Sequence, residues 1–156
     1  MRKFCPMGKI EEEIKQKEFR NQYNKLLINV LYTSSWLNGL QNSIFKVHGL
    51  TPQQYNSLRI LRGQYPDAAS VNLLKDRMID KMSNVSRIVD KLKSKGLVTR
   101  EPCDHDRRQV DVKITEEGLK LLEKIDQEWE QWEQNLHTIS EEDAKKANEI
   151  LDKWRN

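Results

Sequence analysis

The hydrophobic pattern of residues 85–114 changes from a helical period to a strand period, with a glycine between the two halves. The first half has apolar residues at the three-four spacing of a helix with one buried side, at Val85, Ile88, Val89 and Leu92. Gly96 follows, and glycine readily adopts the left-handed backbone that ends a helix. The second half turns over residues 102–106 and then alternates apolar with charged side chains, at Val110, Val112 and Ile114. This pattern predicts a helix followed by a two-stranded β hairpin.

Residues 50–82 predict two further helices ahead of this segment. Thr51, Pro52 and Gln54 have the spacing of a capping box that starts a helix, and the segment around Pro66 closes it. Ser70 is a candidate N-cap for a short helix, and residues 78–82 form the turn that joins it to the helix described above. Helix, turn, helix and hairpin make a winged helix-turn-helix, whose second helix enters the major groove of DNA.

Long amphipathic helices are expected on both sides of this region. An apolar ladder runs from Phe19 to Val47, and its 29 positions would span roughly 43 Å as one helix. Because the core of one small domain does not cover such a length, part of the stripe is expected to meet another chain. Thr115 and Ser140 are candidate caps of two C-terminal helices. We expect a mainly α fold in a single domain over residues 1–156, with dimerisation helices at about 10–48 and 116–156 around a winged helix-turn-helix at about 50–115.

The net charge of the chain is only +3, but the charges are unevenly placed. Residues 72–115 carry 11 basic and 7 acidic side chains, whereas residues 116–156 carry 6 and 12, so the C-terminal segment is not expected to lie on phosphates. The chain begins without the apolar stretch of a secretory signal and has no apolar run of membrane length, so a cytoplasmic protein is expected. A Gly-rich phosphate loop, an HExxH motif and a GxSxG motif are all missing, which argues against an enzyme and against a bound cofactor.

The outward face of the second helix suits the reading of base edges. Its polar residues near the helix start are Ser83, Asn84, Ser86, Arg87 and Lys91. An asparagine can pair with an adenine edge, and an arginine with guanine or with a phosphate. The hairpin tip carries Asp106, Arg107 and Arg108, where arginine suits the narrow minor groove and a carboxylate holds its guanidinium extended. These residues predict a surface for double-stranded DNA.

Five ordered segments resemble the multiple antibiotic resistance regulator (MarR) family of bacterial winged-helix transcription factors. The segments are residues 50–55, 85–92, 95–98, 106–108 and 114–118. The resemblance implies a homodimer on a palindromic operator, usually a repressor that a small-molecule effector releases. It also implies an effector pocket near Tyr32, Trp36, Phe45 and Tyr55, for which an ordinary core role is the competing interpretation.

The turn before the second helix departs from the family pattern. Many relatives have a glycine there, whereas this chain has Met78-Ile79-Asp80-Lys81-Met82. The start of the helix is therefore open, and Asp80 and Ser83 are both candidate caps.

Other assignments compete with DNA reading. One is a winged-helix dimer that serves as a protein interaction module without DNA binding. Another is a thiol redox sensor acting through Cys5, although this cysteine precedes a proline in the leader. Residues 103–106 include metal-capable side chains, but their spacing suits a loop better than a tetrahedral site, so no metal is expected. Three tryptophans are expected to anchor a dimer interface: Trp129, Trp132 and Trp154.

Overall fold

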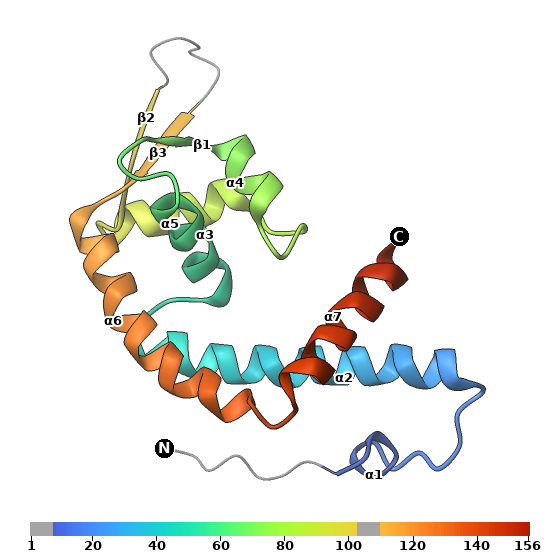
Figure 1. The fold of residues 1–156 in the computed structure, drawn as a ribbon. Coiled ribbons are helices and arrows are strands. Elements are labelled where there is room, and N and C mark those ends of the chain that lie inside the picture. Colours follow the sequence, from blue (N-terminus) through green and yellow to red (C-terminus); the bar gives the residue numbers. More distant parts are fainter. Residues whose placement is uncertain (1–7, 103–109) are drawn as a thin grey trace. The chain divides into compact units, whose positions relative to one another are not determined.

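The computed structural model describes residues 8–102 and 110–156, which are mainly helical, as the sequence predicts. The described residues belong to two units, one reaching to Ile125 and the other beginning at Asp126. In chain order, the elements are α1 (Ile10–Glu13), α2 (Gln22–Val47), α3 (Pro52–Arg62), β1 (Ala69–Ser70), α4 (Val71–Arg77), α5 (Val85–Ser94), β2 (Val98–Pro102), β3 (Val110–Ile114), α6 (Glu116–Glu133), a 3-10 turn (Gln134–Leu136) and α7 (Glu141–Arg155) (Figure 1).

The wing is part of a three-stranded antiparallel sheet in the order β1-β3-β2 (Figure 1). β2 and β3 pair from Val98 opposite Ile114 to Pro102 opposite Val110, as the alternating pattern predicts. The predicted two-stranded wing is confirmed, and β1 adds a third strand that pairs with the other side of β3 through Ala69 and Val112. A strand of two residues is too short to show an alternating pattern, so nothing in the sequence distinguishes it from a loop.

The core of the first unit lies between this sheet and helices α3, α4 and α5. These helices contact one another, and both α3 and α4 contact β3. The side chains they bury come from every element of the region, including Leu58, Leu61, Leu74, Val89, Leu92 and Val112. The predicted stripe of α5 is confirmed at Val85, Val89 and Leu92, whereas Ile88 is only half-buried.

Four of the predicted polar caps are confirmed, those at Thr51, Ser70, Thr115 and Ser140. The Thr51 hydroxyl accepts the N–H of Gln54, and the Gln54 side chain returns a contact to the Thr51 N–H, which completes the capping box. Each of three further hydroxyls accepts a backbone N–H three residues ahead: Ser70 from Leu73, Thr115 from Gly118 and Ser140 from Asp143. These contacts satisfy backbone donors that the first turn of a helix leaves unpaired.

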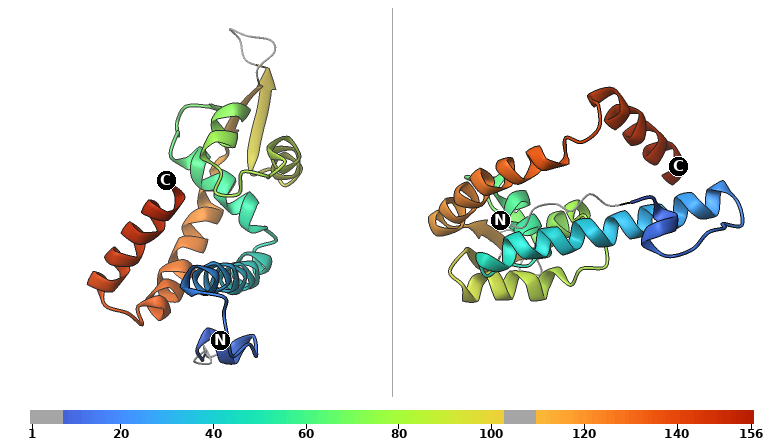
Figure 2. Two further views of the ribbon diagram at one scale, coloured as in Figure 1. Left: turned by 90° about the vertical axis from the view of Figure 1, so that its right-hand side faces the viewer. Right: turned by 90° about the horizontal axis from the view of Figure 1, so that it is seen from below.

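Helix α2 starts later than its apolar ladder suggests. Its N-cap is Asn21, whose extended backbone stops the helix and whose side chain accepts the N–H of Asn24 at 2.9 Å. Phe19, the expected first rung, therefore precedes the helix, and residues 14–21 are not helical. The apolar spacing continues from Phe19 into the helix without a break. Spacing of apolar residues alone therefore does not show that Asn21 caps the helix. The helix is otherwise one continuous rod (Figure 2). It ends at Val47, and Gly49 follows the His48 C-cap with φ +67°.

The second unit contains the end of α6, the 3-10 turn and α7. Trp129 and Trp132 lie in contact, with ring centroids 4.7 Å apart. Ile139, Ile150 and Trp154 are exposed to solvent. The two predicted C-terminal helices are confirmed.

Candidate nucleic-acid interface

The turn between α4 and α5 is held by hydrogen bonds from its own residues and from α3. Asn56 of α3 accepts the N–H of Ile79 at 3.0 Å, and Asp80 accepts the N–H of Met82 at 3.0 Å. The Ser83 hydroxyl, the Met82 N–H and the Gln53 side chain, in that order of effect, lower the pKa of the Asp80 carboxyl. Asp80 is thus a charged acceptor that stabilises the turn.

Helix α5 begins at Val85, and its N-cap is Asn84. The Asn84 side-chain oxygen accepts the N–H of Arg87 at 3.1 Å. Both expected caps, Asp80 and Ser83, are therefore wrong, since the Asp80 carboxylate serves the turn and Ser83 precedes the cap. The Asn84 side chain is exposed, and because its oxygen caps the helix, its amide NH₂ is the group that can donate to a partner.

The outward face of α5 is exposed as predicted. Ser86, Arg87 and Lys91 are exposed, together with Asn84 ahead of the helix, while Ser83 is half-buried. This face lies opposite the stripe of Val85, Val89 and Leu92, which fixes the rotation of the helix about its axis. The helix ends in a Schellman motif, in which the N–H of Leu97 bonds the carbonyl of Leu92 and Gly96 has φ +72°.

Two side-chain contacts of α5 were missed by sequence reasoning. Arg100 of β2 donates to Asp90 at 2.5 Å, so an ion pair joins the wing to the reading helix. Lys95, just after α5, donates to the carbonyl of Gly49 and to the side chain of buried Gln54, the latter at 3.2 Å. Lys95 therefore ties the end of α5 to the junction of α2 and α3. The opposite charges of Asp90 and Arg100 are the sequence signal for the ion pair, whereas the contacts of Lys95 have no local signal.

The wing tip lies outside the described residues, and so do Asp106, Arg107 and Arg108. The same holds for Cys5 and for the metal-capable segment 103–106. Within residues 8–102 and 110–156, no group of three or more His, Cys, Asp or Glu side chains could hold a metal ion. In that same part of the chain, no helix is long and apolar enough to cross a bilayer.

The four candidate effector residues are not gathered at one place on the chain. Phe45 and Tyr55 are buried and stacked, with ring centroids 4.2 Å apart, where α2 meets α3. Trp36 and Tyr32 are half-buried on α2, and the 13 residues from Tyr32 to Phe45 span about 20 Å of helix. The stacked pair therefore has a structural role in the core, whereas Tyr32 lies nearer the N-terminal segment.

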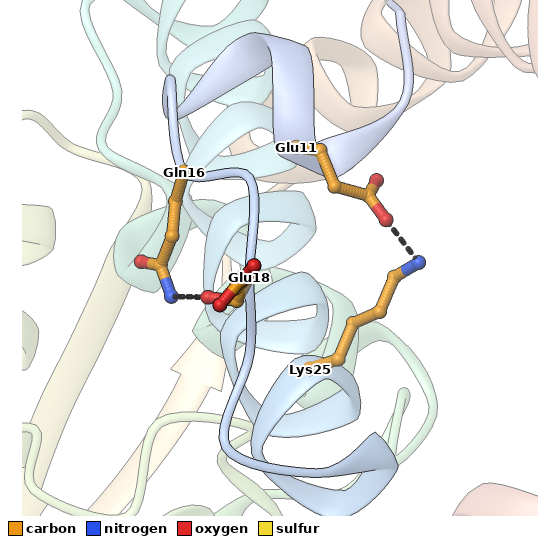
Figure 3. Close-up of polar contacts among 4 residues, drawn as sticks. All are labelled: Glu11, Gln16, Glu18 and Lys25. Atoms are coloured by element: carbon orange, nitrogen blue, oxygen red, sulfur yellow. Dashed lines mark hydrogen bonds and ion pairs between the residues drawn. The ribbon is translucent and has the colours of Figure 1, made fainter.

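Tyr32 is engaged by the segment that precedes α2. Its hydroxyl donates to Glu13 at 2.8 Å, and Lys25 forms an ion pair with Glu11 (Figure 3). The hydroxyl of Tyr32 and the N–H of Gly8 lower the pKa of Glu13, while the Glu13 carboxylate raises the pKa of Tyr32. A short α1 with buried Ile10 is thus fastened to α2 by charged and polar contacts.

A basic, exposed second helix followed by a wing defines a winged helix-turn-helix protein. Residues 48–109 match the model of the MarR family. The chain is 28% identical over 130 residues to the HTH-type transcriptional regulator MhqR of Bacillus subtilis, covering 81% of this chain and 87% of MhqR. It is 26% identical over 121 residues to the transcriptional repressor MprA of Escherichia coli K12, covering 74% and 69%. The chain is thus similar to MarR-family transcription regulators.

A solved structure has the same fold. It is the structure of BpsR from Bordetella bronchiseptica, a protein whose DNA binding is regulated by 6-hydroxynicotinic acid. The TM-score is 0.65 at 24% identity, and the match covers 82% of this chain and 99% of BpsR.

Proposed function

We propose that this protein is a homodimeric repressor that binds a palindromic operator in double-stranded DNA. The observation that carries the proposal is the outward face of α5, where Ser86, Arg87 and Lys91 are exposed at the end of a helix-turn-helix. In proteins of this architecture, the second helix lies in the major groove and two-fold symmetry places a second copy about one helical turn away. Repression is carried over from MprA, which is a transcriptional repressor.

Within this proposal, the side chains of the reading face have separate roles. Arg87 contacts a guanine or a phosphate, and Asn84 offers its NH₂ to an acceptor on a base edge. Lys91 neutralises backbone phosphate, with Ser86 as a shorter polar contact. The hydroxyl of Ser83 is buried, so this residue is not proposed as a DNA contact. At the wing tip, Asp106 holds Arg107 and Arg108 toward the minor groove.

Dimerisation is proposed from apolar side chains that one chain leaves exposed. Tyr23, Leu27 and Leu31 are 79%, 46% and 61% exposed, and they recur every four residues on α2. Such spacing forms one stripe on a helix. An exposed stripe of large apolar residues is typical of an interface with another chain.

We further propose that a small-molecule effector weakens DNA binding by favouring one of two dimer conformations. BpsR offers the precedent of DNA binding regulated by a small aromatic acid. The candidate contacts are the half-buried Tyr32 and Trp36, one turn apart on α2, whereas the stacked Phe45–Tyr55 pair stays in the core.

The test begins with selection of bound sequences from random DNA duplexes, followed by affinity measurement at several salt concentrations. A regulator should prefer its selected site by at least ~10³-fold over unrelated DNA. Its affinity should also fall steeply as salt rises, since bound phosphates release counterions. Arg87→Ala should cost about 1 to 3 kcal/mol per contact, whereas Arg155→Ala, an exposed arginine of the acidic C-terminal segment, should leave affinity unchanged. Absence of any preference would favour a protein interaction module.

The redox alternative has its own measurement. Operator affinity before and after peroxide treatment, with thiol titration in parallel, tests whether Cys5 senses oxidants. We expect unchanged affinity, because a lone thiol needs a neighbouring positive charge to become reactive at neutral pH.

A further inference from the structure

The turn ahead of the reading helix exposes two large apolar side chains. Met82 is 92% exposed and Ile79 is 85% exposed, the two highest values among the exposed large hydrophobic residues of the described chain. A single exposed apolar side chain is common on a protein surface. Two of them close together, beside a proposed DNA-reading surface, indicate that this surface binds a partner.

The turn holds these side chains on a defined backbone. The N–H of Ile79 is bonded to Asn56 and that of Met82 to Asp80, while Asp80 also receives the side chain of Gln53 at 3.5 Å. A backbone fixed from α3 reduces the entropy lost when the turn meets a partner. The exposure is therefore a stable property of the turn.

The surroundings of the turn carry a slight excess of positive charge, since three basic side chains accompany the two acidic ones, Asp76 and Asp80. Lys75 and Arg77 are exposed at the end of α4, and Lys81 lies between the two apolar residues, with its ammonium on the carbonyl of Asp76 at 2.5 Å. A partner for this surface must combine negative charge with small apolar groups. The DNA major groove does so, because phosphates border it and each thymine presents a 5-methyl group there.

We propose that Met82, extended by Ile79, contacts thymine 5-methyl groups in the major groove and thereby sets a preference for thymine in each half-site. The inference rests on the proposed DNA-binding function. Met82 lies two residues before the Asn84 cap, so its surface continues directly into the reading face of α5. A methionine side chain is flexible and polarizable, which suits contact with a small methyl group. DNA fits this surface better than a second copy of the chain, because a second copy bound at the turn would also cover the start of the proposed reading helix α5.

The test replaces thymine with uracil, one position at a time, in the operator selected by the wild-type protein. Uracil lacks only the 5-methyl group and keeps every hydrogen-bonding group, so a change in affinity reports that methyl group alone. Burial of one such group corresponds to about fourfold in affinity. We expect a loss of about fourfold at one or two thymines when one half-site is changed, and about 15-fold when both are changed.

Met82→Ala should lower affinity for thymine DNA by a similar factor and remove the difference between thymine and uracil. Met82→Leu should retain that difference, because it keeps an apolar side chain of similar volume. Lys81→Ala is the matched control in the same turn, and it should leave the thymine-to-uracil ratio at its wild-type value.

Equal affinity of the wild-type protein for thymine and uracil at every position would overturn the inference while leaving the proposed function intact. The same holds if Met82→Ala keeps the wild-type difference between thymine and uracil DNA. Failure to select any DNA site would overturn the proposed function as well.

Discussion

Gly118 lies in the first turn of α6, against the turn after α5 and the end of β3. A Cβ added there would lie 2.5 Å from the carbonyl oxygen of Leu97 and 2.7 Å from the side chain of Ile114. Gly118→Ala should therefore destabilise the fold by about 1 to 3 kcal/mol, which circular dichroism would register as a melting temperature lower by about 3 to 10 °C.

Gly39→Ala is the control, because nothing lies within 4 Å of that position. In the middle of α2, alanine should stabilise by roughly 0.5 to 1 kcal/mol. Equal shifts in the two variants would contradict the packing argument.

Asn84 combines the capping of α5 with the proposed reading of a base. Asn84→Ser keeps an oxygen for the N–H of Arg87 but removes the NH₂ donor, so the free energy of unfolding should change by less than ~0.5 kcal/mol. Operator affinity should fall by about tenfold, as expected for loss of a base contact of ~1 to 3 kcal/mol. Asn84→Ala should lower both stability, by about 1 kcal/mol, and affinity. Urea unfolding and DNA titration on the same samples separate the two roles, and unchanged affinity in Asn84→Ser would exclude the reading role.

At the scale of an element, the attachment of α1 to α2 should depend on pH. The pKa of Glu13 is lowered from 4.5, so its contribution is present above that value and is lost as the pH falls through the lowered pKa. The pKa of Tyr32 is raised from 10.0, so the contact is also lost as the pH rises through the raised pKa. The methyl resonances of buried Ile10 should thus be constant between about pH 5 and 9 and shift beyond both limits. Tyr32→Phe should shift them at neutral pH, and a flat profile in wild type would contradict the contact.

The elements differ in how far the sequence predicts them. Periodic stripes and polar caps are local signals, so α3, α4, α5 and the β2–β3 pair follow from residues such as Thr51, Ser70 and Gly96. The short β1 pairs with β3, whose paired residues lie 41 and 43 positions further along the chain, and it has no pattern of its own. The start of α5 was missed because Asp80, Ser83 and Asn84 are all good caps, and only the hydrogen bonds distinguish them. Contacts such as Lys95 with Gly49 depend on the packed fold.

At the scale of the whole molecule, the specificity proposed for α5 requires two copies. One copy reads one half-site, and linking two reading heads raises affinity because the second binding step becomes intramolecular. The exposed stripe of Tyr23, Leu27 and Leu31 is the surface of α2 proposed to meet the partner. The wild-type protein should therefore sediment at twice the 18.5 kDa mass of the chain.

Leu31→Lys should shift this equilibrium toward the monomer. The side chain is 61% exposed in one chain, so a charge there is tolerated in the folded monomer but is costly in an apolar interface. Lysine also keeps the helix propensity of leucine. Asn29→Lys adds the same charge to an exposed position on the other side of α2 and serves as the control. Analytical ultracentrifugation over a range of concentrations gives the masses. In parallel, the Leu31→Lys variant should bind a full palindrome about as weakly as a single half-site. The wild-type protein and Asn29→Lys should still bind the full palindrome more tightly. A wild-type monomer, or a dimer equally stable in both variants, would rule out this stripe as the interface.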